Sequence, residues 1–584
     1  GLDGVASAEA GSRSVEVLFQ ERFVKALSDG TLIHRHHQLF LVRSKEALEA
    51  WGEVPLPEGA EVLIARTWRR ASSGRLLAVE SEDWSSTGAI SLSGLGEGTV
   101  AEVAVVWIEE PDEAHAPTWS TARFPLGFED ADVAHARVVL HHGDRQPIQV
   151  ESGGQVRVTR EEGRVEVEAQ DVSALPVEPL DPRPELRLPW VRFSGGAPKG
   201  LTVQRWHAAE ALRAARALRV TPTVAQRAAE ITKGLSDERE RLEALHGAVL
   251  TDIQDEATSL GAYEASVVLG RGAGERSVAL VALCRAAGHR CDLVAARPMA
   301  RGLERPLEKL VDSDDWVYPI VRAKTRSGVV WLDTASAYSP FDFIPPMLAG
   351  VEGLVLDNAL SRVRLPPAQE GSRGQRVLEL TVRVSPDGSY VAQGEETLTG
   401  LYAMSWRHVL VEMTAEQRQN ALDRLVQASL PGSGLETLRF EGLETRGAPL
   451  VVHWRAHGAT LSGEKEARLS VALSPENLSR STVHLAKRSA PLLVSRSTDL
   501  EVRLTIELPV SWRLSRPPAS IEVDQSLIRY HRSAESKERS VRIFKTCGLS
   551  VGLISPSVYP SWVEAARDVD RADRIELVFE RPAQ

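Results

Sequence analysis

Short runs of alternating apolar and polar residues, separated by turn sequences, fill roughly the first 170 residues of the chain. Successive side chains of a strand point to opposite faces, so this alternation is the pattern of half-buried strands. Residues 14–20 and 31–42, joined by the turn Ser28-Asp29-Gly30, are predicted to form a hairpin. Further strands are predicted at residues 61–68, 75–80, 99–109, 136–141, 156–159 and 164–169. Such spacing with little helix is typical of a β-sandwich or a strongly curved antiparallel sheet.

Helical patterns replace the strands from about residue 203. Helices are predicted at residues 203–219, 222–233, 236–253 and 275–288. In the third helix, Ser236 is the expected cap, and Leu242, Leu245 and Val249 lie on one apolar face. Strands are then predicted at residues 291–296, 317–323 and 329–332. Helices followed by antiparallel strands indicate an α+β domain.

Strand patterns return after Pro366, beginning with a hairpin around Pro386-Asp387-Gly388. Two helices interrupt them, and the second begins with Thr414 and Gln417 in a capping-box spacing. The predicted elements are strands at residues 377–384, 390–398, 436–442, 450–456, 466–471 and 499–507, helices at 402–412 and after 414, a last helix at 562–567 and a last strand at 574–579. We therefore expect a flexible segment 1–13, a β-sandwich domain 14–200, an α+β domain 201–365 and a β-rich domain with inserted helices 366–584.

Composition and charge narrow the classes of function. The 584 residues are 43% hydrophobic and 26% charged, as in ordinary globular proteins of several domains. A net charge of −11 and a pI near 5.9 argue against general affinity for nucleic acid or anionic membranes. Cys284, Cys291 and Cys547 suggest no disulfide framework, and no run is long and apolar enough to span a bilayer. No signal peptide is visible. A start at Gly1 rather than Met is consistent with a processed or trimmed protein.

Residues 270–288, GRGAGERSVALVALCRAAG, have the pattern of a catalytic helix. The glycines of residues 270–274 allow close backbone approach, and residues 278–284 are apolar on nearly every side, so the helix is expected to be buried until Gly288 ends it. A helix N-terminus stabilises a thiolate or an oxyanion. Neither Cys nor Ser, however, stands where this helix begins.

Three runs of the central region carry a family resemblance. VALCRAAG at residues 281–288 resembles the helix that follows the catalytic Cys of transglutaminase-like domains. YPIV at 318–321 and VWLDT at 330–334 resemble the two strands that carry the family's His and Asp. Residues 90–107 are similar to an N-terminal β domain of the DUF3857 type found in a bacterial variety of the family. Smaller matching runs are LGEG at 95–98, FDFIPP at 341–346, and ISP at 554–556 with Tyr559. The resemblance implies a multidomain α+β fold, with a central transglutaminase-like (papain-like cysteine-protease-type) domain between two β-sandwich-like domains.

In active members of the family a Cys attacks a carbonyl, a His deprotonates the Cys and an Asp orients the His. Counting back from Arg285 without gaps places the Cys position at Ala273, and a shift of one residue places it at Gly274. The His position falls on Tyr318, and only Asp333 matches its role. The resemblance thus implies a degenerate triad, a pseudoenzyme and no cofactor.

The remnant of an active-site groove is expected between the helix start and the strand of Tyr318. Its predicted lining is Gly272, Gly274, Glu275, Arg276, Ser277, Trp316, Tyr318 and Asp333. One alternative is a rewired site in which Ser277 is the nucleophile or Glu275 the base, together with Asp333. The simpler interpretation is that Glu275 favours the helix N-terminus and Arg276 forms a salt bridge to the loop. Asp333 is expected to accept backbone donors of the following turn, and a hydrogen bond from Tyr318 or Arg276.

Two other clusters contain residue types that ligate metals. Asp312, Asp314 and Asp315 lack the glycine and the distant Glu of a calcium loop, which favours a solvated acidic loop. His34 and His36 share one face of a strand without a Cys or a third His nearby, which favours a mixed surface strand. No metal site is predicted.

The sequence favours a non-catalytic pseudo-transglutaminase that binds or scaffolds protein or peptide. The alternatives are a hydrolase or acyl transferase with the rewired site, and a purely structural subunit of an envelope assembly. Trp84, Trp119 and Trp316 lie in loop-like stretches and are candidates for a binding surface, with packing as the default. The resemblance implies placement in the bacterial periplasm or envelope. The partner and the oligomeric state stay open.

Overall fold

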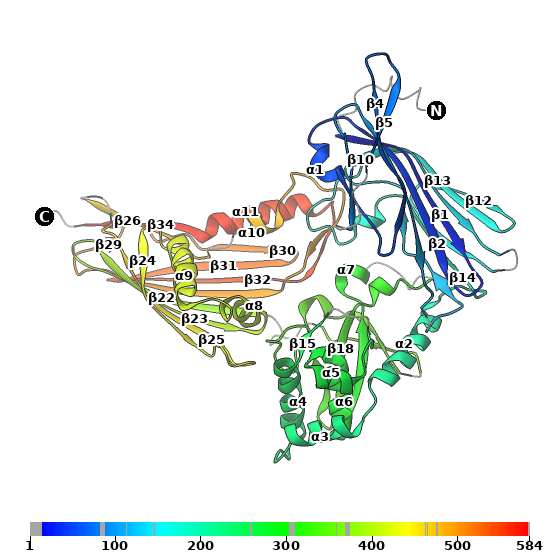
Figure 1. The fold of residues 1–584 in the computed structure, drawn as a ribbon. Coiled ribbons are helices and arrows are strands. Elements are labelled where there is room, and N and C mark those ends of the chain that lie inside the picture. The colour runs from blue at the N-terminus through cyan, green and yellow to red at the C-terminus, as the bar shows by residue number, and fades with distance from the viewer. Residues whose placement is uncertain are drawn as a thin grey trace. The chain divides into compact units, whose positions relative to one another are not determined.

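A computed structural model describes residues 14–81, 88–112, 114–143, 146–256, 260–302, 310–357, 359–367, 374–461, 463, 465–474 and 477–581. The predicted flexible segment 1–13, Trp84 and the side chain of Asp314 lie outside the described part. The chain forms two compact units, one of Gly1–Glu178, Arg183–Glu210 and Arg305–Asp312, the other of Pro179–Pro182, Ala211–Glu304 and Ser313–Gln584. Both units contain large sheets, so the protein is β-rich (Figure 1). The predicted domain boundaries stay predictions.

The first unit contains an eight-stranded sheet of order β12-β13-β10-β1-β2-β7-β4-β5. A smaller sheet has the order β11-β14-β8, with β9 also paired to β14. Phe40 and Val138 of the large sheet share one core with Phe124 and Phe193 of the small sheet, so the two sheets pack on each other. The strands are β1 (Val15–Ala26), β2 (Leu32–Val42), β4 (Glu61–Arg70), β5 (Leu76–Glu80), β7 (Val100–Glu109), β8 (Trp119–Ser120), β9 (Phe124–Pro125), β10 (Ala131–His141), β11 (Gln149–Gly153), β12 (Arg157–Glu161), β13 (Arg164–Val172) and β14 (Trp190–Gly195). The short α1 (Ala47–Trp51), β3 (Glu53–Pro55) and β6 (Ala89–Ser91) lie between them in the chain.

The strand with the histidine pair differs from its prediction. β1 and β2 form the predicted antiparallel pair, but β2 also pairs with β7 and is therefore an inner strand of the sheet. His34 is buried, stacks on Trp107 and places its Nε2 3.0 Å from Oε2 of Glu109. The prediction of a mixed surface strand is therefore wrong at His34, because an aromatic layer that includes Phe124 covers this face.

The central part of the second unit packs helices on a five-stranded antiparallel sheet of order β19-β18-β17-β20-β21. Helix α6 contacts α3, α4, α5, β17 and β18, and all nine residues from Arg276 to Cys284 are buried, as its apolar pattern predicts. Asp237 caps α4 by accepting from two backbone N–H groups, so the predicted cap at Ser236 is off by one residue. Helix α2 (Val203–Ala217) has its first half in the first unit and its second half in the second unit. The other elements are α3 (Pro222–Ile231), α4 (Glu238–Asp252), β15 (Gln254–Asp255), α5 (Ala265–Arg271), β16 (Ala273–Gly274), α6 (Arg276–Ala286), β17 (Arg290–Ala296), α7 (Met299–Gly302), β18 (Tyr318–Thr325), β19 (Gly328–Leu332), β20 (Glu352–Val355) and β21 (Ser361–Arg364).

The carboxy-terminal part of the second unit has an eight-stranded sheet of order β24-β25-β23-β22-β28-β32-β31-β30 and a three-stranded sheet of order β26-β34-β29. One core joins both sheets with α8 and α9, and α9 begins with the predicted capping box of Thr414 and Gln417. The strands are β22 (Gly374–Val384), β23 (Tyr390–Thr399), β24 (Ser433–Glu441), β25 (Leu450–Gly458), β26 (Glu466–Ala472), β27 (Leu492–Val494), β28 (Thr498–Glu507), β29 (Arg513–Leu514), β30 (Ile521–Gln525), β31 (Ile528–Lys537), β32 (Ser540–Leu549), β33 (Gly552–Ile554) and β34 (Arg574–Glu580). The helices are α8 (Gly400–Leu410), α9 (Ala415–Ser429), α10 (Leu478–Thr482) and α11 (Tyr559–Asp573).

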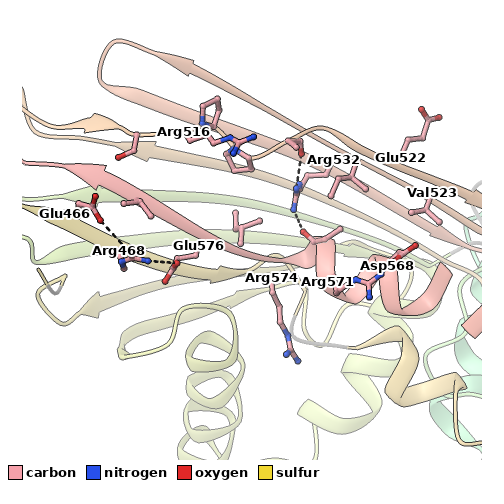
Figure 2. Close-up of a pocket in the computed structure, with 18 residues that line it drawn as sticks. Glu466, Arg468, Arg516, Glu522, Val523, Arg532, Asp568, Arg571, Arg574 and Glu576 are labelled. Atoms are coloured by element: carbon pink, nitrogen blue, oxygen red, sulfur yellow. Dashed lines mark hydrogen bonds and ion pairs between the residues drawn. The ribbon is translucent and has the colours of Figure 1, made fainter. Parts of the chain in front are cut away.

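Helix α11 is much longer than the predicted helix of residues 562–567. It lies against β30 and β31, where Trp562 and Val569 are buried among residues of those strands (Figure 1). A cavity of about 790 Å³ opens beside its last turn (Figure 2). In the described part of the chain, no helix is both long and apolar enough to cross a membrane.

Candidate functional site

The segment just before α6 holds the two positions that the family resemblance assigns to a catalytic Cys. Ala273 and Gly274 form the short strand β16, paired in parallel with Gln254 and Asp255 of β15. Gly274 has φ +131°, and a Cβ placed there would lie 3.0 Å from Cγ2 of Val268. A side chain is strained at Gly274 and not at Ala273, so Ala273 is the better position for a nucleophile. The glycine turn is shorter than predicted, because α5 continues through Gly270 to Arg271, and Gly272 after it has the left-handed conformation.

Tyr318 and Asp333 lie at the same end of the β18–β19 hairpin and are in contact. The Tyr318 hydroxyl donates to Oδ1 of Asp333 at 2.7 Å, as the sequence led us to expect. The Ser339 hydroxyl donates to Oδ2, and the Ala335 N–H donates to Oδ1 at 3.4 Å. Asp333 is 1% exposed, so these donors take the place of water around its carboxylate. Burial and the charge of Asp333 raise the pKa of Tyr318 well above its usual range, which keeps the phenol protonated.

Arg276 is oriented by backbone carbonyls rather than by Asp333. Its Nε donates to the carbonyl of Ile253 at 2.8 Å, and its Nη1 donates to that of Thr334 at 3.4 Å. Burial lowers the pKa of Arg276, while burial also raises the pKa of nearby Asp255. The guanidinium therefore connects the loop before α6 to the turn after β19 through carbonyl groups. The salt bridge expected between Arg276 and the loop does not form among the described residues.

His246 of α4 is a member of this site that the sequence analysis missed. Its Nε2 lies 2.8 Å from the carbonyl oxygen of Asp333. Since a carbonyl only accepts, Nε2 carries the proton. Burial lowers the pKa of His246, so the ring is neutral at pH 7 and positions the backbone of Asp333. A signal was present, because His246 is a polar residue on the apolar face of Leu242, Leu245 and Val249. We call His246, Tyr318, Asp333, Ala335 and Ser339 the Asp333 cluster.

The residues of the predicted groove are mostly buried. Ser277 is 2% exposed, and its hydroxyl has no hydrogen-bond partner among the described residues. Glu275 accepts from the N–H of Gly261 at 2.5 Å. The remaining predicted positions divide into Gly274, Arg276, Trp316 and Asp333, which are buried, and Gly272 and Tyr318, which are half-buried. Trp119 and Trp316 are packed in the interior, so neither offers its ring to a binding surface.

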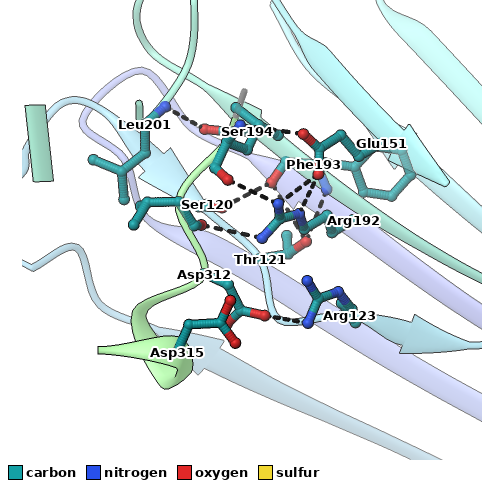
Figure 3. A network of polar contacts seen from close by, with 12 residues as sticks. Ser120, Thr121, Arg123, Glu151, Arg192, Phe193, Ser194, Leu201, Asp312 and Asp315 are labelled. Atoms are coloured by element: carbon teal, nitrogen blue, oxygen red, sulfur yellow. Dashed lines mark hydrogen bonds and ion pairs between the residues drawn. The ribbon is translucent and has the colours of Figure 1, made fainter. Parts of the chain in front are cut away.

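The acidic run before β18 is not a solvated loop, and that prediction is wrong for both of its described aspartates. In the first unit Asp312 forms an ion pair with Arg123, next to the chain segment that Arg192 holds through the carbonyls of Leu310 and Val311 (Figure 3). In the second unit the buried Asp315 pairs with Arg297 at 2.7 Å. Each of these two carboxylates neutralises the charge of an arginine.

Comparisons with known proteins bear on the fold. Residues 467–579 match the family described as "Domain of Unknown Function with solved-structure structure (DUF3858)". No curated protein matches the chain. Its structure is similar to that of a "putative protease" from Parabacteroides distasonis, with 13% identity and a TM-score of 0.64 over 98% of this chain and 100% of that one.

Two further solved structures match with low TM-scores. A "putative cysteine protease" from Cytophaga hutchinsonii has 10% identity and a TM-score of 0.20, over 43% of this chain and 89% of that one. An M1 zinc metallopeptidase from Deinococcus radiodurans has 12% identity and a TM-score of 0.17, over 31% of this chain and 43% of that one. The P. distasonis match at 13% identity shows a shared fold alone. The chain thus shares its multidomain-like, β-rich fold with that protein.

Proposed function

We propose that the chain is a non-catalytic pseudo-transglutaminase that acts by scaffolding or binding other proteins, and that its former catalytic site is retained as a structural element. The observation that supports this most is the 2.7 Å hydrogen bond from Tyr318 to Asp333. In an active triad that carboxylate would orient a His base. A phenol whose pKa is raised cannot accept a proton at neutral pH, and Ala273 offers no nucleophile.

The Asp333 cluster has the properties of a structural connection. Through its carboxylate, Asp333 joins the end of β19 to Tyr318 of β18 and to the following loop at Ser339. Through its carbonyl, it accepts from His246 of α4. One buried residue thereby fixes a hairpin, a loop and a helix. This favours a structural role for the Asp333 cluster, which keeps the central domain in one shape. Partner proteins would then bind at surfaces outside this cluster. Placement in the bacterial envelope is part of the proposal and rests on the family resemblance.

The rewired hydrolase or acyl transferase has less support. Ser277 is buried, and no base is within hydrogen-bond distance of its hydroxyl among the described residues. A serine without a base keeps its proton and is a poor nucleophile. The carboxylate of Glu275 is held by the N–H of Gly261.

Restoring Cys at residue 273 and His at residue 318 tests whether these are the catalytic Cys and His positions. We expect Ala273→Cys/Tyr318→His to react with iodoacetamide at pH 6 about tenfold faster at residue 273 than Ala273→Cys does. The reason is that an imidazole held by Asp333 lowers the pKa of a neighbouring thiol by about one unit or more. Mass spectrometry measures the rate at that residue and separates it from the native cysteines.

The matched control is Ala273→Cys/Tyr318→Phe, which removes the phenol hydroxyl without adding an imidazole. It is expected to react as slowly as the single variant. Equal rates for the His and Phe variants, with both folded by circular dichroism, would show that residues 273 and 318 are not the Cys and His positions.

A further inference from the structure

The cavity beside α11 has an unbalanced set of charges. Its lining includes five arginines and four carboxylates, from β26, β31, β34, the end of α11 and the segment 515–523 (Figure 2). Arg468 pairs with Glu466 and Glu576, and the ion pair of Arg571 with Asp568 occupies another carboxylate. Arg516, Arg532 and Arg574 then face a single remaining carboxylate, that of Glu522.

Arg532 is the most unusual of these cations because it is buried without a counter-ion. The residue is 5% exposed. Its Nη2 donates to the carbonyl of Ala519 at 2.9 Å, and its Nη1 donates to that of Ala572. Its Nε has no hydrogen-bond partner, and no carboxylate pairs with it, among the described residues. A buried guanidinium without a counter-ion is costly. Arg532 lines the cavity, so an anion bound there would neutralise its charge.

A second guanidinium lies on the same side of the cavity. Arg516 is exposed and has neither an ion pair nor a hydrogen bond in the part of the chain that is described. Arg532 donates to the carbonyl of Ala519, three residues after Arg516 in the chain, whereas in Figure 2 Arg574 extends in the opposite direction. Arginines that line a cavity suit the oxygens of a carboxylate or a phosphate, because each guanidinium presents a planar fork of donors.

The remaining wall is apolar. It is formed by Pro517, Pro518, Ile521, Val523, Ile575 and Val578. A volume of about 790 Å³ is in the usual range for small-molecule sites, and an apolar wall with a few convergent polar groups is their usual composition. The bound species should therefore combine an anionic group with an apolar body.

We infer that this cavity binds a small amphipathic oxyanion, with its carboxylate or phosphate against Arg532 and Arg516 and its apolar body on the proline-containing wall. The site lies in the segment that matches DUF3858, apart from the Asp333 cluster in sequence and in chemistry. It stands independently of the proposed loss of catalysis, because neither guanidinium contacts the Asp333 cluster.

Calorimetric titration of the full chain with phenyl phosphate, phenylacetate and phenylacetamide tests the inference. At least one of the two anions should bind saturably, and the neutral amide should not, because only an anion neutralises Arg532. Whichever anion binds identifies the headgroup as phosphate or carboxylate. Arg516→Gln should weaken that binding on the order of tenfold, since it removes one charge-assisted contact.

Arg513→Gln is the matched control, because Arg513 is an exposed arginine of the neighbouring strand β29 that does not line the cavity. It should leave the affinity unchanged. The inference fails if neither anion binds, if phenylacetamide binds as well as the anions, or if Arg516→Gln and Arg513→Gln have the same effect.

Discussion

Replacement of Asp333 by Ala should lower the free energy of unfolding of the second unit by about 3 kcal/mol, because it leaves several buried donors without an acceptor. The Tyr318 hydroxyl, the Ser339 hydroxyl and the Ala335 N–H all donate to this carboxylate, which is almost completely buried. Asp333→Asn should cost less, about 1–2 kcal/mol, since its amide keeps one accepting oxygen and turns an NH₂ group toward a donor. Urea unfolding followed by tryptophan fluorescence measures both.

Glu352→Ala is a suitable control, because Glu352 is an exposed acidic residue of β20 in the same five-stranded sheet. We expect its effect to stay within about 0.5 kcal/mol. If Asp333→Asn and Asp333→Ala both unfold at the same urea concentration as the unmodified chain, the cluster has no structural role.

Replacement of Lys545 by Met should have an even larger effect, about 3–5 kcal/mol, because it leaves a buried carboxylate without its cation. Lys545 of β32 is fully buried, and its Nζ donates to Oδ2 of Asp573 at 2.6 Å. Tyr530 donates to the other oxygen at 3.0 Å and cannot supply a charge. Met has a volume similar to that of Lys, so the lost stability reports on the missing charge rather than on packing.

The pH dependence separates this explanation from a packing defect. Burial already raises the pKa of Asp573 above that of the unfolded chain, and loss of Lys545, whose charge opposes that shift, should raise it further. Below the raised pKa, the folded state holds a proton that the unfolded state releases, so the folded state gains stability as the pH falls. The destabilisation by Lys545→Met should therefore be smaller at pH 5 than at pH 7.5. A loss of equal size at both pH values contradicts an unpaired Asp573 as its cause.

Local sequence patterns predicted many helices and strands, because these elements form through interactions between residues that are close in sequence. Alternation revealed the β1–β2 hairpin, a helix apolar on all sides revealed the buried α6, and the spacing of Thr414 and Gln417 revealed the cap of α9. The contact between Tyr318 and Asp333 was accessible for the same reason, since both residues belong to one predicted hairpin.

Contacts between distant parts of the chain could not be read in this way. The parallel pairing of β1 with β10 and the ion pair of Arg123 with Asp312 each join residues more than 100 positions apart. His246 meets Asp333 across 87 positions, so its polar character on an apolar face was the only local sign. The cavity at Arg532 depends on the meeting of two sheets and a helix end, and no single run of residues encodes it.

The proposed loss of catalysis is tested most directly by incubating the full chain with a labelled amine and a glutamine-containing protein, beside an active transglutaminase as positive control. With Ala273 and Tyr318 in the nucleophile and base positions, we predict incorporation no greater than that of heat-denatured chain. Incorporation well above that level, abolished by Ser277→Ala in a variant that still folds, would show that the chain is an enzyme with a rewired site.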